Sequence, residues 1–135
     1  MRIKMNRTIK FRGKSADNGK WITGYYYHEC GNTYIVEDRQ SLSETSRNVP
    51  YVVIPETVGQ FTGLFDNNGK EIYEGDILFM GNDEYENIYN KVGIKDGCFG
   101  YIGEYSGELL PFCNYNVTEE VVGNIYDNPD LIKEE

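Results

Sequence analysis

The stretch from Val52 to Met80 constrains the fold more than any other part of the sequence. Two runs rich in β-branched and aromatic residues flank Asp66-Asn67-Asn68-Gly69, whose last two residues tolerate the positive φ angles of a tight hairpin turn. A second turn follows at Glu74-Gly75-Asp76, and the unbroken apolar run Ile77–Met80 is then typical of a strand buried on both faces. We therefore predict a β-hairpin followed by a buried strand.

Turn-forming residues divide the rest of the chain into further short strands. The Asp96-Gly97 pair is a strong signal for a two-residue hairpin, and Pro55 is expected to end a strand or to place it at a sheet edge. Residues 37–48 are polar and rich in Ser, so we predict a mobile loop there. The pattern predicts one mostly β domain over residues 1–135, a sandwich or partly open barrel of short strands with Gly-rich bends. The other strands are expected at residues 8–11, 21–27, 33–36, 51–54, 89–94, 98–102 and 121–126.

The chain is acidic, with 13 Lys and Arg against 22 Asp and Glu and a net charge of −9. This charge argues against non-specific binding to a phosphate backbone and favours a basic or zwitterionic partner, although solubility alone would also explain it. The sequence has no secretion signal and no apolar run long enough to cross a bilayer, so we expect a cytoplasmic protein. Basic residues concentrate near the amino terminus, which leaves nucleic-acid binding by a barrel as a weaker alternative. They are Arg2, Lys4, Arg7, Lys10, Arg12, Lys14 and Lys20.

Aromatic residues make up 14% of the sequence, and the strand predicted at residues 21–27 is the richest in them. In an extended strand Trp21, Tyr25 and Tyr27 share one face, while Ile22 and Tyr26 share the other. One face is expected to be core, and the other to be covered by a second sheet or by a subunit. Trp21, Tyr25 and Tyr27 are therefore the candidate interaction surface.

Four residues with metal-binding side chains were considered as a zinc site: His28, Cys30, Cys98 and Cys113. The Cys-x-x-Cys knuckle that structural zinc sites use is absent, so we expect no bound metal, and buried or inert thiols are the alternative. Glu71, Glu74 and Asp76 are three carboxylates within six residues. We expect Asp76 to cap a turn through a backbone N–H while the two glutamates face water.

Three blocks of this sequence resemble the YopX family of phage and prophage proteins. The first joins Ile9-Lys10-Phe11-Arg12-Gly13-Lys14 with Gly19-Lys20-Trp21-Ile22-Thr23-Gly24-Tyr25-Tyr26, the second is Val53 to Ile77, and the third is Val121 to Pro129. The resemblance spans nearly the whole chain except the segments 29–50 and 81–116. It implies a mostly β pseudo-barrel and a phage or prophage setting in a bacterial host. It implies no established activity, so no functional residue is carried over.

The residues predict a binding or assembly protein that is not an enzyme and uses no cofactor, and the resemblance implies that a phage or prophage encodes it. The expected partner is a host or phage protein or a second copy in a homo-oligomer, in the cytoplasm of the host cell, and neither a membrane nor nucleic acid. One alternative is an acidic decoy for a host nucleic-acid-binding protein, and another is a metal-dependent enzyme that uses His28 with Cys30 or the carboxylates near Asp76. The decoy requires a contiguous carboxylate face built from Asp83, Glu84, Glu86 and either Glu104 or Glu108.

Overall fold

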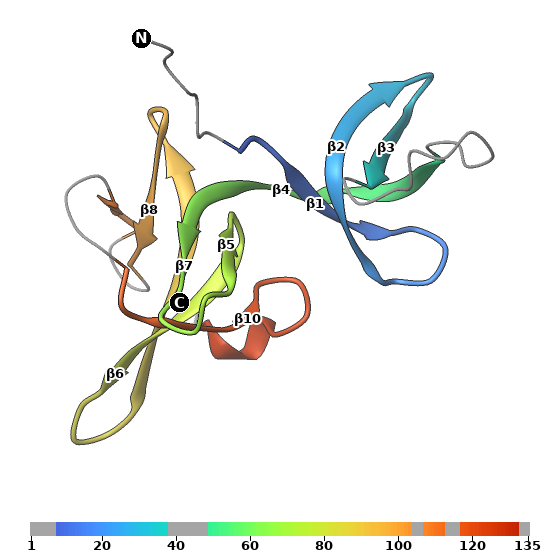
Figure 1. The fold of residues 1–135 in the computed structure, drawn as a ribbon. Helices are drawn as coiled ribbons and strands as arrows, with labels where there is room; N and C mark the ends of the chain where they lie inside the picture. The colour runs from blue at the N-terminus through green and yellow to red at the C-terminus, as the bar shows by residue number, and fades with distance from the viewer. Residues whose placement is uncertain (1–7, 38–48, 104–106, 113–116, 133–135) are drawn as a thin grey trace, which may run out of the picture. The chain divides into compact units, whose positions relative to one another are not determined.

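The computed structural model of the chain describes residues 8–37, 49–103, 107–112 and 117–132. Over these residues it is built of antiparallel β-strands and one short 3-10 helix, with no α-helix (Figure 1). The mostly β fold class is therefore confirmed. The elements are β1 Phe11–Ser15, β2 Trp21–Glu29, β3 Asn32–Glu37, β4 Pro50–Phe65, β5 Glu71–Tyr73, β6 Asp76–Asn82, β7 Asn87–Lys95, β8 Cys98–Ile102, β9 Leu109–Pro111, β10 Glu120–Asn124 and η1 Pro129–Leu131.

The chain divides into two compact units, Met1–Phe61 and Thr62–Glu135. The long strand β4 contributes its first twelve residues to unit 1 and its last four to unit 2. Each unit has its own cluster of buried apolar side chains. The expectation of one domain stays a prediction, and the predicted mobile loop, apart from Glu37 at the end of β3, lies outside the described residues.

Unit 1 is a sheet that is partly ring-like without being a complete barrel. Strands β1, β2, β3 and β4 pair in this order, and β1 also pairs with β4. The inner side of this sheet buries Ile22, Ile35 and Val53. Gly13 lies opposite Ile22 in the β1–β2 register, and a Cβ there would approach the Ile35 side chain to 2.9 Å and the Val53 Cβ to 3.2 Å. A residue with no side chain therefore lets the strands approach around this small core.

Of the two expectations for Pro55, the one that it ends a strand is wrong, because β4 continues through this residue. The register between β1 and β4 shifts here, from Arg12 opposite Gly59 to Lys14 opposite Ile54, so β4 contains an irregular stretch of extra residues. Proline is tolerated at such a bulge because no ladder N–H is needed. The buried Thr57 joins the two strands: its Oγ1 accepts a hydrogen bond from the Lys14 N–H (2.9 Å) and donates one to the Ile54 carbonyl (2.6 Å).

The first strand was also placed wrongly, since β1 covers Phe11–Ser15 and not residues 8–11. Ser15 lies outside the strands expected from the sequence, but it pairs with Val53 of β4, so a partner distant in sequence extends the strand. The Asp96-Gly97 hairpin is confirmed: both residues have positive φ, as in a type I′ turn, and connect β7 to β8. Cys30-Gly31 makes the same kind of turn between β2 and β3, since both residues have positive φ.

Unit 2 contains an antiparallel sheet in the order β10-β6-β7-β8-β9. Ile77 and Leu78 of β6 are both fully buried, which confirms a strand with apolar residues on both faces at this point. The core beside them combines aliphatic and aromatic side chains, with the rings of Tyr101 and Phe112 packed edge to face at 4.7 Å. The buried core residues are Ile72, Leu78, Val92, Tyr101, Phe112, Val117 and Val121.

The predicted hairpin at Asp66–Gly69 is present between β4 and β5, although only Gly69 adopts a positive φ. The buried Asp66 carboxylate holds the turn together, because Oδ1 accepts hydrogen bonds from the N–H groups of Asn68 (2.9 Å) and Lys70 (2.8 Å). Its Oδ2 accepts a third hydrogen bond from the N–H of Val121 in β10 (3.0 Å). One carboxylate therefore fixes the turn and attaches it to a strand 55 residues away.

Candidate functional site

An aromatic and aliphatic surface extends over β2, β3 and β4 of unit 1 on the side opposite its core. The registers place Tyr27 opposite Tyr34, Tyr25 opposite Val36, and Tyr34 opposite Val52. Directly opposite residues project to the same face of an antiparallel sheet, so these side chains lie together. We call this surface the tyrosine face and define it by Tyr25, Tyr27, Tyr34, Val36, Val52 and Ile54.

The tyrosine face is exposed although its side chains are mostly apolar. Tyr25 is 56% exposed, Tyr27 38%, Val52 42% and Ile54 38%. The rings of Tyr27 and Tyr34 stack with centroids 5.0 Å apart and an interplanar angle of 22°. Stacking restricts both rings before any partner arrives, which lowers the entropy cost of binding.

Trp21 shares this side of β2 with Tyr25 and Tyr27, as predicted. It is half-buried, whereas the two tyrosines are exposed, because two cationic side chains cover its ring. The Arg12 guanidinium lies 4.8 Å from the Trp21 ring centroid, and the Lys14 ammonium lies 5.9 Å from it. Both cations come from β1, where Lys14 is directly opposite Trp21. The three predicted residues therefore differ: two tyrosines are open, and the tryptophan forms a cation–π cluster at one end.

The inner side of β2 carries rings as well, as the sequence pattern indicated. Tyr26 packs edge to face against Phe11 of β1, with centroids 4.5 Å apart. Further along β2, the Nδ1 atom of His28 is hydrogen-bonded to the Thr33 hydroxyl at 2.9 Å. His28 thus takes part in a cross-strand pair within the β2–β3 hairpin.

The residues considered for zinc binding are not brought together within the described part of the chain. Cys30 leaves β2 and sits in a turn with φ 52°, so it does not continue the extended strand that holds His28. Cys98 begins β8 in unit 2, and Cys113 lies outside the described residues. Residues 8–37, 49–103, 107–112 and 117–132 contain no group of three or more His, Cys, Asp or Glu side chains that could hold a metal ion.

The carboxylates near β5 have structural partners. The buried Asp76 accepts a hydrogen bond from the Tyr73 N–H at 2.7 Å, which confirms that it caps this turn. Glu71 accepts a hydrogen bond from the Tyr73 hydroxyl at 3.2 Å. Both Glu71 and Glu74 are half-buried, so the expectation that they simply face water is only partly met.

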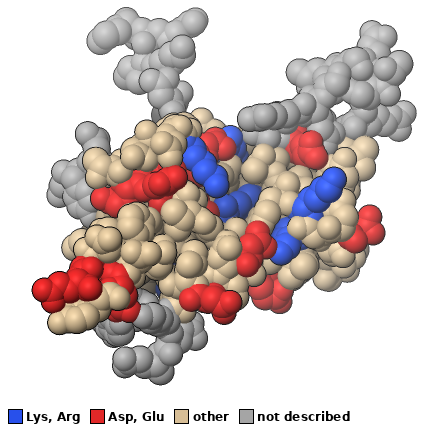
Figure 2. All heavy atoms as spheres, turned by 90° about the horizontal axis from the view of Figure 1, so that it is seen from below, with Lys and Arg blue, Asp and Glu red and all other residues tan. Residues whose placement is uncertain are grey.

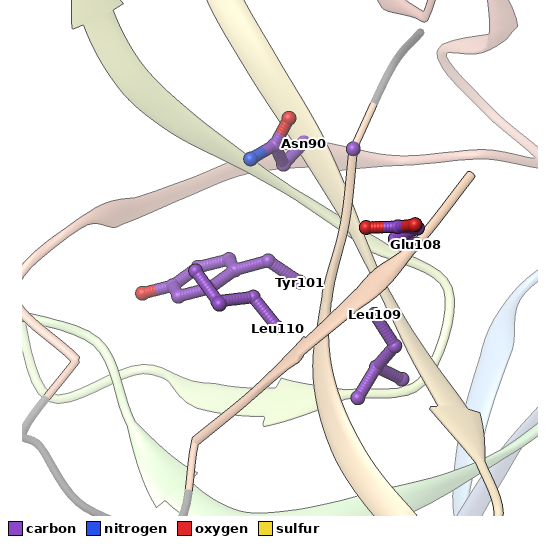
Figure 3. Close-up of a pocket in the computed structure, with 6 residues that line it drawn as sticks. Asn90, Tyr101, Glu108, Leu109 and Leu110 are labelled. Atoms are coloured by element: carbon purple, nitrogen blue, oxygen red, sulfur yellow. The ribbon is translucent and has the colours of Figure 1, made fainter. Parts of the chain in front are cut away.

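A cavity of about 240 Å³ lies beside β7, β8 and β9 of unit 2 (Figure 3). Figure 3 shows Tyr101 and Leu110, which are directly opposite in the β8–β9 register, together at one side, with Glu108 at another. The volume is below the roughly 300–1,000 Å³ of typical ligand pockets. In addition, the Tyr101 hydroxyl donates a hydrogen bond to the Glu119 carboxylate. We therefore take the tyrosine face, and not this cavity, as the candidate site.

The two units carry charges of opposite sign. Residues 1–61 include nine Lys and Arg against six Asp and Glu, whereas residues 62–135 include four against sixteen. Exposed Asp and Glu side chains form several separate groups on the face drawn in Figure 2. Of the residues that the decoy hypothesis requires, Asp83, Glu84 and Glu86 lie between or next to β6 and β7, and Glu104 lies outside the described residues.

No helix in the described part of the chain has the length and apolar character needed to span a membrane. A family model described as YopX protein matches residues 10–133. Among solved structures, the fold is similar to that of protein EF1440 from Enterococcus faecalis, with a TM-score of 0.62 and 25% sequence identity. This similarity covers 93% of the present chain and 99% of the other. A search of curated proteins found no match.

Proposed function

This chain belongs to the YopX family, and from that premise we propose that it is a phage- or prophage-encoded binding protein that performs no chemistry and recognises another protein through its tyrosine face. The observation that carries the proposal is the exposure of Tyr25, Tyr27, Val52 and Ile54 on one face of a paired sheet. A sheet with one face on its own core and a second apolar face in water is typical of a protein that buries the second face against something else.

The composition of the tyrosine face supports a protein partner. Tyrosine is enriched at protein interfaces because it offers a large contact area with only two side-chain torsions to restrict. The rigid β2–β3–β4 pairing holds these side chains in fixed relative positions. A preorganised aromatic surface of this kind is suited to docking against a complementary apolar patch.

Affinity capture with matched variants tests the proposal. Tagged wild-type protein, the double variant Tyr25→Ser/Tyr27→Ser and the control Tyr85→Ser are incubated with lysate of a bacterial host, and bound proteins are quantified by mass spectrometry. Tyr85 is a suitable control because it is 88% exposed and lies in unit 2. We expect a set of proteins that wild type and Tyr85→Ser retain and the double variant loses. Equal retention by all three proteins would refute a role for the tyrosine face.

The acidic decoy is a second candidate, and the charge of residues 62–135 favours it. Unit 2 has sixteen acidic and four basic side chains. The electrostatic field around this unit is therefore closer to that of a polyanion than the net charge of the whole chain indicates. If unit 2 acts as a decoy, capture of a host nucleic-acid-binding protein should weaken steeply as salt rises. Substitution of Asp83, Glu84 and Glu86 by Asn or Gln should then release that protein, whereas Tyr25→Ser/Tyr27→Ser should not.

A further inference from the structure

We propose that the tyrosine face packs against the same face of a second copy of this chain, related to the first by a two-fold axis. This inference rests on the proposed function, because it uses the same surface, and it adds the identity of the partner and the geometry of the contact. Two sheets packed face to face, with interdigitated apolar side chains, form the usual sandwich arrangement. The second copy would then supply an outer layer that the described residues of unit 1 do not provide.

The two ends of the tyrosine face along β2 carry charges of opposite sign, so two copies that run in opposite directions can pair them. On the side of β2 that carries Tyr25, the cation–π cluster of Lys14 with Trp21 lies at one end and the exposed Glu29 at the other. Tyr25 is midway between Trp21 and Glu29 in sequence, so each end is roughly 13 Å from it along the strand. A two-fold axis that passes over Tyr25, parallel to the sheet and perpendicular to β2, therefore brings Glu29 of each copy toward Lys14 of the other.

The charge of the whole chain opposes this pairing less than its net value of −9 indicates. The excess of acidic residues belongs to residues 62–135, whereas residues 1–61 carry three more basic than acidic side chains. The tyrosine face itself contains no charged side chain among its six residues. Two tyrosine faces in contact therefore bring no like charges together within these six residues, and screening at physiological salt weakens repulsion between more distant charges.

The area of the face sets the expected strength. The four side chains whose exposed fractions are given above present roughly 400 Å² to solvent, so a dimer that covers them completely buries about 800 Å² from both copies. This is below the roughly 1,200–2,000 Å² of stable specific interfaces, in the range of weak and transient association. We expect a dissociation constant on the order of 100 µM.

Sedimentation velocity of the full chain, from about 10 to 500 µM, tests the proposal with reciprocal charge variants. Lys14→Glu and Glu29→Lys each place like charges opposite one another twice in the homodimer. Each should therefore weaken dimerisation by about tenfold. In an equimolar mixture of the two variants, Glu29 meets Lys14 and the introduced charges meet each other, so dimers should return to nearly the wild-type level. Lys95→Glu, an exposed charge reversal in unit 2, should not change the dissociation constant by more than about twofold.

Several outcomes would overturn the inference. They are a wild-type protein that is monomeric up to the highest concentration, dimerisation that neither charge variant weakens, and a mixture that does not recover. Far-UV circular dichroism verifies that each variant keeps the secondary structure of the wild type, and recovery in the mixture requires that unit 1 is folded. If wild type is monomeric but host-protein capture still depends on Tyr25 and Tyr27, only the second-copy inference fails. If wild type is monomeric and capture is also independent of Tyr25 and Tyr27, the proposed function fails together with the inference.

Discussion

Replacing Asp66 is the sharpest test of how unit 2 is held together. The carboxylate accepts hydrogen bonds from three backbone N–H groups, those of Asn68, Lys70 and Val121, at 2.8–3.0 Å. Asp66→Ala removes all three acceptor contacts at once. The Val121 N–H is the most affected, because its bond to Asp66 is buried and water cannot easily replace the carboxylate.

The expected loss of stability follows from these contacts. A hydrogen bond to a charged group contributes about 1.5–3 kcal/mol, and the two donors in the turn regain part of this from water when the carboxylate is removed. We therefore expect Asp66→Ala to lower the free energy of unfolding by about 3–5 kcal/mol, a large fraction of the roughly 5–15 kcal/mol typical of a small domain. Asp66→Asn should cost less, about 2 kcal/mol, because its amide oxygen still accepts from the turn.

Asp83 provides the matched control, because its carboxylate makes a similar but exposed turn. It accepts hydrogen bonds from the N–H groups of Tyr85 (2.7 Å) and Glu86 (2.9 Å). Asp83→Ala should cost less than about 1 kcal/mol, since water replaces the lost acceptor. Urea denaturation followed by circular dichroism measures both losses, and amide hydrogen exchange at Val121 reports the local contact. Equal losses for Asp66→Ala and Asp83→Ala, or unchanged exchange at Val121, would refute the reasoning.

The same carboxylate predicts how stability depends on pH. Burial raises the pKa of Asp66, but the N–H donors of Val121, Lys70 and Asn68 and the charge of Lys70 outweigh it, so the pKa is lower in the folded chain. A lowered folded-state pKa stabilises the fold above the unfolded value of about 3.9, and this contribution is lost as pH falls through the folded-state pKa. Below about pH 4, the wild type should therefore lose more stability than Asp66→Ala does, as measured by urea midpoints at each pH.

Two further predictions concern backbone geometry. A Cβ on Gly100 would lie 2.3 Å from the Leu110 carbonyl oxygen, so Gly100→Ala should separate β9 from β8 and cost about 2–3 kcal/mol. Gly93→Ala should cost clearly less, because the atom nearest to the added Cβ is the movable end of the Ile102 side chain. Urea denaturation of both variants measures the two losses, and a larger loss for Gly93→Ala would contradict this account. Cys30 has a φ of 52°, which asparagine tolerates better than cysteine. Cys30→Asn should therefore raise the melting temperature, with a gain in stability of up to about 1 kcal/mol. A lower melting temperature would exclude strain at this turn.

Local signals predicted much of the secondary structure correctly. The Asp96-Gly97 turn was predicted because the residue types that tolerate positive φ are few, and the buried pair Ile77 and Leu78 because a continuous apolar run has no exposed face. The shared face of Trp21, Tyr25 and Tyr27 followed from the two-residue period of a strand. All of these depend on residues that are neighbours in sequence.

The errors arose where distant segments decide the outcome. Pro55 is a strand breaker by its local chemistry, but the bulge opposite β1, joined by Thr57 and Lys14, gives it a place without a ladder N–H. Ser15 belongs to a strand only because Val53 is its partner. The cations that cover Trp21 likewise come from β1 and were not associated with it in the sequence.

By itself the sequence determined the β class, most turns and the aromatic strand, because the strand period and the φ preferences of individual residues act over a few positions. Only the tertiary structure decided that β1 pairs with both β2 and β4, and that the charge divides between two units. It also decided that Tyr25 and Tyr27 remain exposed while Trp21 is covered. Exposure depends on what packs across a face, and that is set by contacts between residues far apart in the chain.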